Sequence, residues 1–241
     1  MTYGRWNSAK AISVSSNGVA VTAADGPAPQ WTLDMVDYLQ TLVDDGQKEI
    51  DRFWRQVFAT EAGQIRQSLG VSLAVYTSPH HIALLADSAP TACRSNATTN
   101  DAFYCFDDFT VYLGRGFLVG ELARGGNFLP ILILSHEWGH HIQNILKISP
   151  LDIPKSLNSR NIELQADCFA GLYAQDAARR GLLDLGDVEE AANSLYRAGD
   201  PQKYAWFAQG AHGTADERIA AWHFGQQHGL VGCLNEMFLS L

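Results

Sequence analysis

The sequence predicts a mainly helical α+β fold with a small β-sheet, and two observations support this class. Apolar residues recur at helical spacing over three long segments, residues 33–57, 127–147 and 160–180, whereas strand-like alternation is confined to short segments. The chain of 241 residues is 46% hydrophobic, which suits one domain with a sizeable core. We expect this domain over residues 31–241, after an N-terminal extension and linker over residues 1–30.

The first half of the domain is expected to hold one long helix and two strands. Thr32 is the expected cap of the amphipathic helix that opens the domain. Gly46 lies inside this helix and predicts a break or a bend, because glycine is a poor helix former. Alternating residues then predict one strand over residues 71–76 and another over residues 109–113.

The second half is expected to be helical throughout. The third long segment should end at Gly181, because glycine tolerates the left-handed conformation that often closes a helix. Asp187 is the expected cap of the next helix. A last helix is predicted from Thr214 to about Gln227, where Thr214 and Glu217 have the spacing of a capping box.

The strongest chemical signal is the pattern H-E-x-x-H within the second long segment. His136 and His140 are four residues apart, so a helix places both imidazoles on one face, where they can bind the same metal ion. Glu137 lies beside the first histidine, close enough to take a proton from a metal-bound water. This arrangement is typical of zinc hydrolases. The alternative, a surface helix with scattered histidines, fits poorly because the helix is apolar where it enters the motif.

A catalytic zinc ion needs a third protein ligand. A downstream histidine of the metzincin type is excluded, because the relevant positions hold Gln143 and Leu146. Glu163 is the candidate, with Asp167 four residues later on the same helical face of an otherwise apolar run. Carboxylates in such a run are expected to bind a metal or a partner. Asp167 would accept the ring N–H of a ligating histidine. The alternative is two solvated carboxylates on an exposed stripe.

Two further residues near the last predicted helix are candidates for the site. His212 precedes the helix on a loop next to Gly213, where its side chain can point into a cleft. Arg218 lies one turn into the helix. Either residue could stabilise the oxyanion that forms when water attacks a carbonyl. For Arg218, an ion pair with Asp167 is an equally good explanation.

Three of these segments carry a family resemblance. The runs HEWGHHIQ, ELQADCFAGLYA and HGTADERI, in this order and spacing, resemble the putative neutral zinc metallopeptidase family of bacteria. The resemblance extends from about Thr32 to Phe238 over five separated blocks. It departs from the family pattern at Ala211, where serine is usual, and over residues 106–108, where Cys-Pro-x-Asp is usual. The resemblance implies a gluzincin-type metallopeptidase with Glu163 as the third ligand.

We therefore expect a zincin-like core that hydrolyses peptide bonds in a peptide or protein substrate. One catalytic Zn²⁺ ion would polarise the scissile carbonyl and lower the pKa of its bound water, and Glu137 would act as general base. In zincins the edge strand of the sheet lies above the metal helix and pairs with the substrate. Thr110, Val111 and Tyr112 are our candidates for that edge. The alternative is a binding or structural module that zinc only stabilises.

Four cysteines, none in a C-x-x-C pattern, allow three pairings. A bond between Cys93 and Cys105 would close a short polar loop, and one between Cys168 and Cys233 would tie the C-terminal segment to the helix of Glu163. A cysteine in a polar loop is a poor core residue, which favours disulfides and an extracytoplasmic location, secreted, periplasmic or on the cell surface. The alternative is four reduced thiols in a cytoplasmic protein.

Charge and hydropathy exclude several classes of partner. The formal net charge is −9 and no cluster of lysine and arginine stands out, so we expect neither nucleic acid nor an anionic membrane as a partner. No segment approaches the ~20 apolar residues of a membrane-spanning helix. The first ten residues lead into no apolar segment, so we expect no secretory signal or anchor in this chain.

Overall fold

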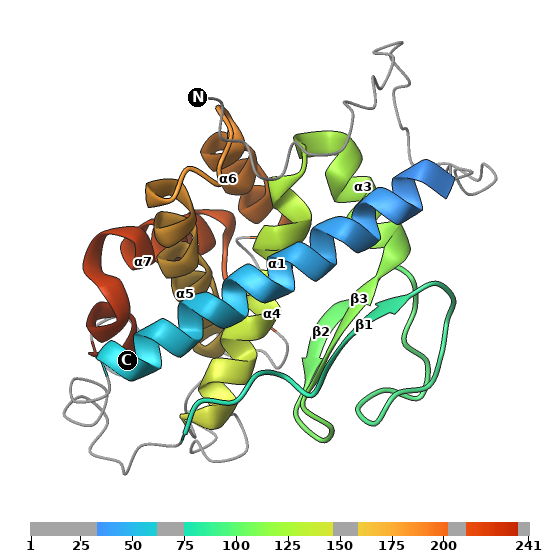
Figure 1. The fold of residues 1–241 in the computed structure, drawn as a ribbon, viewed down its shortest axis with the longest axis horizontal. Coiled ribbons are helices and arrows are strands. Elements are labelled where there is room, and N and C mark those ends of the chain that lie inside the picture. The colour runs from blue at the N-terminus through green and yellow to red at the C-terminus, as the bar shows by residue number, and fades with distance from the viewer. Residues whose placement is uncertain (1–32, 62–74, 147–158, 202–210, 236–241) are drawn as a thin grey trace.

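The computed structural model describes residues 33–61, 75–146, 159–201 and 211–235. The described part is mainly helical with one small sheet, which confirms the predicted α+β class. In Figure 1 the sheet lies to one side of the helices, and helix α1 crosses in front of α4 and α5, which it contacts. In chain order the elements are α1 (Leu33–Thr60), β1 (His81–Leu85), β2 (Ala102–Cys105), β3 (Thr110–Gly114), α3 (Arg115–Gly125), α4 (Phe128–Ile145), α5 (Ser159–Arg179), α6 (Asp187–Ala198) and α7 (Ala215–Asn235).

The sheet has the strand order β1-β3-β2, with β1 parallel and β2 antiparallel to β3. Strand β3 confirms the predicted strand over residues 109–113, but it lies in the centre of the sheet. The prediction that Thr110, Val111 and Tyr112 form the substrate edge is therefore wrong, because neighbouring strands pair with the β3 backbone on both sides. Val111 is fully buried, as expected for a central strand.

The edges of the described sheet are β1 and β2, and neither was predicted as a strand. The strand predicted over residues 71–76 lies mostly outside the described residues, and its last two residues, Val75 and Tyr76, belong to no strand. Because β2 also contacts α4, it is the edge that faces the predicted metal helix.

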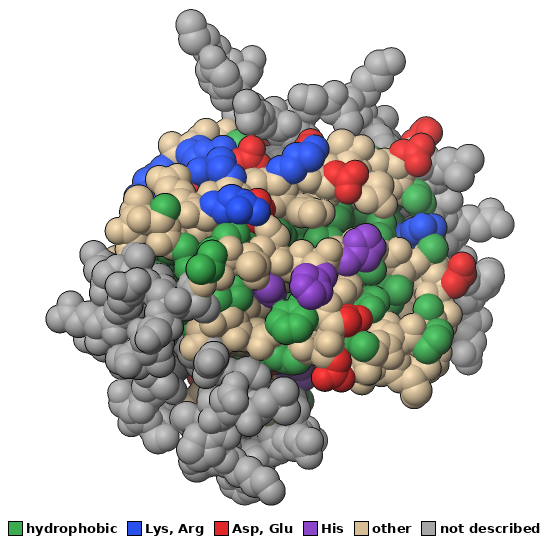
Figure 2. Space-filling view, turned by 60° about the horizontal axis from the view of Figure 1, so that its bottom comes forward, with side chains coloured by type: hydrophobic (Ala, Val, Ile, Leu, Met, Phe, Trp, Pro, Cys, Tyr) green, Lys and Arg blue, Asp and Glu red, His purple; other side chains and the backbone are tan. Residues whose placement is uncertain are grey.

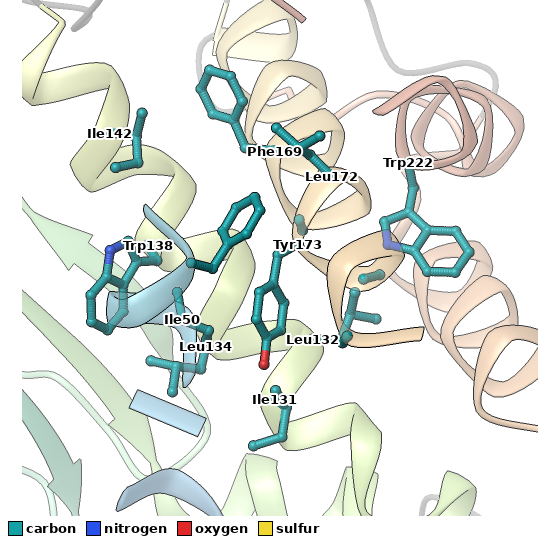
Figure 3. Packing of buried hydrophobic residues seen from close by; sticks show 14 of the residues in the cluster. Ile50, Ile131, Leu132, Leu134, Trp138, Ile142, Phe169, Leu172, Tyr173 and Trp222 are labelled. Atoms are coloured by element: carbon teal, nitrogen blue, oxygen red, sulfur yellow. The ribbon is translucent and has the colours of Figure 1, made fainter. Parts of the chain in front are cut away.

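Helix α4 occupies the centre of the molecule. It contacts α1, α3, α5 and α6 as well as strands β2 and β3. Figure 3 shows Leu134, Trp138 and Ile142 of α4 in the hydrophobic core together with Ile50 of α1 and Phe169 of α5. A helix that is buried on most sides has few solvent-facing positions, and this one keeps a mostly apolar sequence around its polar motif.

Two glycines permit close packing against α4. Helix α1 runs without interruption through Gly46, so the predicted break is wrong. A Cβ atom at Gly46 would lie 2.5 Å from the Ile131 side chain, which shows that this glycine makes room for α4. Within α4 itself, a Cβ atom at Gly139 would lie 3.0 Å from the Cα atom of Ala166 in α5. The helix of the histidines and the helix of Glu163 thus approach each other closely.

Two of the predicted helix termini are confirmed. Beyond α5, Gly181 has a φ of +67° and closes that helix as predicted. At the start of α7, Thr214 and Glu217 form the predicted capping box, with the Thr214 amide donating to the Glu217 carboxylate at 2.9 Å. Asp187 does not cap α6, because it is already helical and accepts a hydrogen bond from the Asp184 amide instead.

The predicted end of the last helix is wrong, and the predicted cap of the first helix is untested. The last helix extends beyond the predicted end at Gln227 to Asn235, with a non-helical kink at Gly229. Thr32, the expected cap of α1, lies outside the described residues.

Both predicted disulfides are present. Cys93 and Cys105 close the loop that leads into β2, and Cys168 and Cys233 join α5 to α7. In the described part of the chain, no helix is long and apolar enough to cross a membrane. The face shown in Figure 2 has basic side chains mainly near one border, where acidic side chains lie among them.

Candidate metal centre

The structure brings the three predicted metal ligands together. Helix α4 places His136 and His140 one turn apart, and α5 places Glu163 opposite both of them. The Glu163 carboxylate lies 3.3 Å from Nε2 of His136 and 3.6 Å from Nε2 of His140. One ligand atom from each of the three residues lies within 4.8 Å of the other two, so a single ion can contact all three.

The hydrogen-bond partner of Nδ1 in each imidazole determines which ring nitrogen carries the hydrogen. Nδ1 of His136 lies 2.8 Å from Asp167, and Nδ1 of His140 lies 2.8 Å from Oε1 of Gln143. The Gln143 amide nitrogen donates to the Ile162 carbonyl, which fixes the orientation of the amide. Both partners of the histidines are therefore acceptors, and each Nδ1 must donate a hydrogen.

With Nδ1 protonated, a neutral imidazole has its lone pair on Nε2. The lone pairs of His136 and His140 then point at a carboxylate, which is itself an acceptor. Three converging acceptors are stable only around a cation, either a shared proton or a metal ion. In the metal-free protein, burial opposes charge on His136, but the Asp167 and Glu163 carboxylates outweigh burial and raise its pKa to about 10. Two imidazoles and one carboxylate are a donor set that suits Zn²⁺.

Asp167 forms an ion pair with Arg218 behind His136. Nε and one terminal nitrogen of Arg218 donate to the two Asp167 oxygens, each at 2.8 Å. The third nitrogen faces the Ala198 carbonyl at 3.3 Å. Asp167 is completely buried, which by itself would raise its pKa, but the adjacent guanidinium lowers the pKa below its usual value. Of the two alternatives for Arg218, the structure shows the ion pair.

Glu137 lies in the same cleft with a different environment. Its side chain is buried, and burial raises its pKa, although the neighbouring imidazoles and a backbone hydrogen bond from Tyr104 oppose that rise. In the described part of the chain, no lysine or arginine pairs with Glu137. Its carboxylate is therefore not held in an ion pair as Asp167 is.

His212 lines the cleft from the loop before α7, as predicted. Its backbone amide donates to Asp200 at 2.6 Å, and its Nδ1 lies 3.4 Å from the same carboxylate. Half of the side chain is exposed. Its neighbour Asp200, which orients the loop, was not identified from the sequence, because it lies 12 residues earlier in a segment without a motif.

His141, the second histidine of the His-His pair, is not a ligand. Its Nε2 lies 2.7 Å from the Thr77 carbonyl and must donate, so its Nδ1 accepts a hydrogen bond from the Tyr104 hydroxyl at 3.0 Å. Asn144 donates to that hydroxyl in turn, at 2.9 Å. Burial lowers the pKa of His141 to about 4. The bonds to Tyr104 join β2 to α4. The sequence feature that could have indicated them is His141 itself, because it follows His140 directly and lies off the helical face of the two proposed ligands.

The cleft around the centre has a volume of about 520 Å³. Besides His136, His140, Glu163 and Glu137, its lining includes residues of β2 and of helices α3, α5 and α6. The described structure thus gives the candidate metal group an open side that faces a cavity.

Comparisons with known proteins agree with this centre. The sequence profile described as putative neutral zinc metallopeptidase matches residues 36–233. Protein YpfJ of Escherichia coli is 32% identical in an alignment of length 158 that covers 58% of this chain and 55% of YpfJ. Proteins Mb2605 of Mycobacterium bovis and Rv2575 of Mycobacterium tuberculosis are each 33% identical in an alignment of length 111 that covers 43% of this chain and 38% of each relative.

These alignments span about half of YpfJ and less of the mycobacterial proteins. No solved structure matches the chain. The profile match covers the ligand helices α4 and α5 and most of α7. The chain therefore belongs to the putative neutral zinc metallopeptidase family.

Proposed function

We propose that this protein is a zinc peptidase with a zincin-like core, comprising residues 31–241. The observation that carries the proposal is the convergence of two imidazole lone pairs and one carboxylate on a single point at the floor of a cleft. His136, His140 and Glu163 would hold the ion. Zn²⁺ bound there would supply Lewis acidity toward the scissile carbonyl and acidify a water molecule.

The protein's own groups would move the protons. Glu137 lies in the cleft and pairs with no lysine or arginine among the described residues, so its carboxylate is available to take a proton from the attacking water. It would then return that proton to the leaving amine. Asp167, held by Arg218, would keep the His136 ring in the orientation that ligation requires.

The substrate backbone would lie along β2 rather than β3. Strand β2 is an edge of the described sheet, contacts α4, and contributes Ala102, Phe103 and Tyr104 to the cleft lining. An extended peptide can add to such an edge through main-chain hydrogen bonds. This placement keeps the predicted mode of substrate binding and changes only the strand.

A zinc-stabilised binding or structural module is the alternative. Structural zinc sites are usually closed by four protein ligands. Among the described residues the candidate group contains three, and a cleft reaches it. We therefore favour catalysis.

Metal analysis combined with a digest of a peptide library tests the proposal. We expect about one zinc ion per wild-type chain and peptide cleavage that a chelator abolishes. His140→Ala should lose both the zinc and the cleavage. His228→Ala, which changes an exposed histidine outside the cleft lining, is the matched control and should keep both. Unchanged zinc content in His140→Ala would refute the ligand assignment.

For His212 we propose a hydrogen bond to the oxyanion or to a substrate carbonyl. Nδ1 faces Asp200, so Nε2 is the ring nitrogen that remains for the substrate. His212→Ala should then lower kcat on the order of 10²-fold with little change in KM or zinc content. If kcat is unchanged and only thermal stability falls, His212 supports the loop and does not act on the substrate.

The two disulfides support an extracytoplasmic location. Peptide mapping under non-reducing conditions should find both bonds in protein recovered from the native host. Free thiols at all four positions would place the protein in a reducing compartment.

A further inference from the structure

The cleft continues beyond the candidate metal ligands along α4. Leu132 and Ile133 line it as well, and they lie one turn before His136 and Glu137. Side chains one turn apart on a helix are neighbours, with Cβ atoms about 5–6 Å apart. This part of the cleft is therefore next to the group that would act on the scissile bond.

Two other helices complete the walls at this end. Helix α3 contributes Phe117, and α6 contributes Leu195 and Ala198. Helices α3, α4 and α6 all contact one another. We refer to the site formed by Phe117, Leu132, Ile133, Leu195 and Ala198 as the α3–α4–α6 pocket.

A buried carboxylate fixes the distance between two of these helices. Glu121 of α3 accepts hydrogen bonds from Ser194 at 3.0 Å and from Arg197 at 2.7 Å, both in α6. Arg124 binds the other carboxylate oxygen at 2.9 Å. Both Glu121 oxygens and the Ser194 hydroxyl are therefore already hydrogen-bonded within the protein. The side chains that form the pocket are apolar, and these bonds hold α3 and α6 together behind them.

Apart from Glu137, whose carboxylate the proposed reaction uses, the arginines and carboxylates in the described cleft lining have partners. Arg94 pairs with Asp101 at 3.2 Å, and Arg218 pairs with Asp167. Selection of a charged substrate side chain would require a counter-charge that is not already paired. The lining of the described cleft therefore favours recognition through apolar contact.

We propose that the α3–α4–α6 pocket receives a bulky apolar side chain of the substrate residue that directly flanks the scissile bond. This inference rests on the proposed peptidase function and names its substrate class. An extended peptide advances about 3.3 Å per residue, so a pocket one helical turn from Glu137 is reached by an adjacent residue and not by a distant one. The occupant would be a residue such as leucine or phenylalanine.

The test is a cleavage profile of an unbiased peptide library, read by mass spectrometry, for the wild type and two variants at Ala198. Ala198 is exposed at the end of α6, so a substitution there should not disturb the core. Ala198→Asp places a carboxylate in the pocket and should lower kcat/KM for apolar substrates about tenfold or more. Ala198→Phe fills the pocket and should shift the preference toward small residues. Asn193→Asp is the matched control, because it adds the same charge on α6 outside the cleft lining.

A binding measurement separates this inference from the proposed activity. Fluorescence anisotropy of labelled peptides with the Glu137→Gln protein should show tighter binding when leucine, rather than aspartate, flanks the cleaved bond. Ala198→Asp in the same background should remove that difference.

The outcomes are distinguishable. If the wild type cleaves no peptide in a chelator-sensitive manner, the proposed function fails. If it cleaves without an apolar preference next to the bond, or if Ala198→Asp and Asn193→Asp give the same profile as the wild type, the pocket assignment is overturned while the peptidase function stands.

Discussion

Arginine–carboxylate pairs join helices in two regions of this molecule, and the two regions differ mainly in exposure. At the metal centre, Asp167 is 0% exposed and Arg218 is 8% exposed, and both oxygens of the carboxylate are bound. Between α1 and α5, Arg52 and Arg180 each contact Asp176. Glu49 completes this second group, whose side chains are 15–38% exposed.

The difference shows what each pair can contribute. Exposed pairs gain little over their interactions with water, so the group between α1 and α5 should add little to stability. The pair at the centre cannot return to water without unfolding, so loss of either partner leaves a buried charge. Only the buried pair also contacts a proposed metal ligand, because Asp167 receives the Nδ1 hydrogen of His136. The same chemistry therefore joins helices in one region and orients a proposed metal ligand in the other.

The largest effect should come from a change at Glu137, a carboxylate at the centre that pairs with no arginine among the described residues. Glu137→Gln keeps the size of the side chain but removes the proton acceptor. We expect peptidase activity to fall ~10²–10⁴-fold. Zinc content and thermal stability should stay near the wild-type values. Wild-type activity in this variant would show that Glu137 is not the general base.

The same substitution in both arginine groups tests the comparison directly, and the buried site should respond more strongly. Arg218→Gln leaves Asp167 buried without a counter-charge, so the free energy of unfolding should fall by about 3–5 kcal/mol. Chemical denaturation, followed by circular dichroism, measures this change. A loss below about 1 kcal/mol would mean that the buried pair behaves like an exposed one.

Asp187 is intermediate between the buried and the exposed arginine groups in the size of its expected effect. It is a buried carboxylate whose hydrogen-bond donor is the Asp184 amide. Burial raises its pKa from 3.8 to about 6, and nearby Asp184 and Glu190 add to the rise. Between these two pH values the folded state binds more protons than the unfolded state, so stability falls as pH rises through this window and stays lower above it.

Asp187→Asn removes the ionisable group and keeps an acceptor for the Asp184 amide. We expect the variant to melt about 2–4 °C above the wild type at pH 7.5 and at the same temperature near pH 4. Melting curves across this pH range measure the difference. Equal melting temperatures at both pH values would contradict the raised pKa.

The smallest effect is expected for Arg180→Gln in the exposed group. Arg180 contacts Glu49 at 2.6 Å, but Arg52 also contacts that carboxylate, so neither carboxylate of the group loses all its partners. The free energy of unfolding should change by less than about 1 kcal/mol. Denaturation under the conditions used for Arg218→Gln gives the direct comparison, and equal losses in the two variants would remove the distinction between the regions.

Local spacing made the ligand helices predictable from the sequence. His136 and His140 share a face wherever a helix forms, and Glu163 and Asp167 repeat that spacing in a second apolar run. The Thr214 capping box was predictable for the same reason, because its two partners are three residues apart.

Several features that depend on contacts between distant segments were not predicted. Strand order is one such feature, because the sequence of a short strand can be the same at an edge and in the centre of a sheet. For this reason β3 was predicted at an edge, whereas it lies in the centre. Gly46 is another, because its helix-breaking tendency is overridden by close packing against Ile131 of α4. Gln143, which binds His140, was considered only as a failed ligand position.

The Asp167–Arg218 pair has a consequence for the time at which the centre becomes complete. The helices that carry the ligands, α4 and α5, precede α7 in the chain, and segments near the N-terminus generally fold first during synthesis. Until α7 docks, Asp167 has no guanidinium beside it and the Cys168–Cys233 bond cannot form. A growing chain would therefore acquire a fully oriented His136 only after its C-terminal helix is made. The proposed peptidase, if assembled in that order, would be inactive while it is still being synthesised.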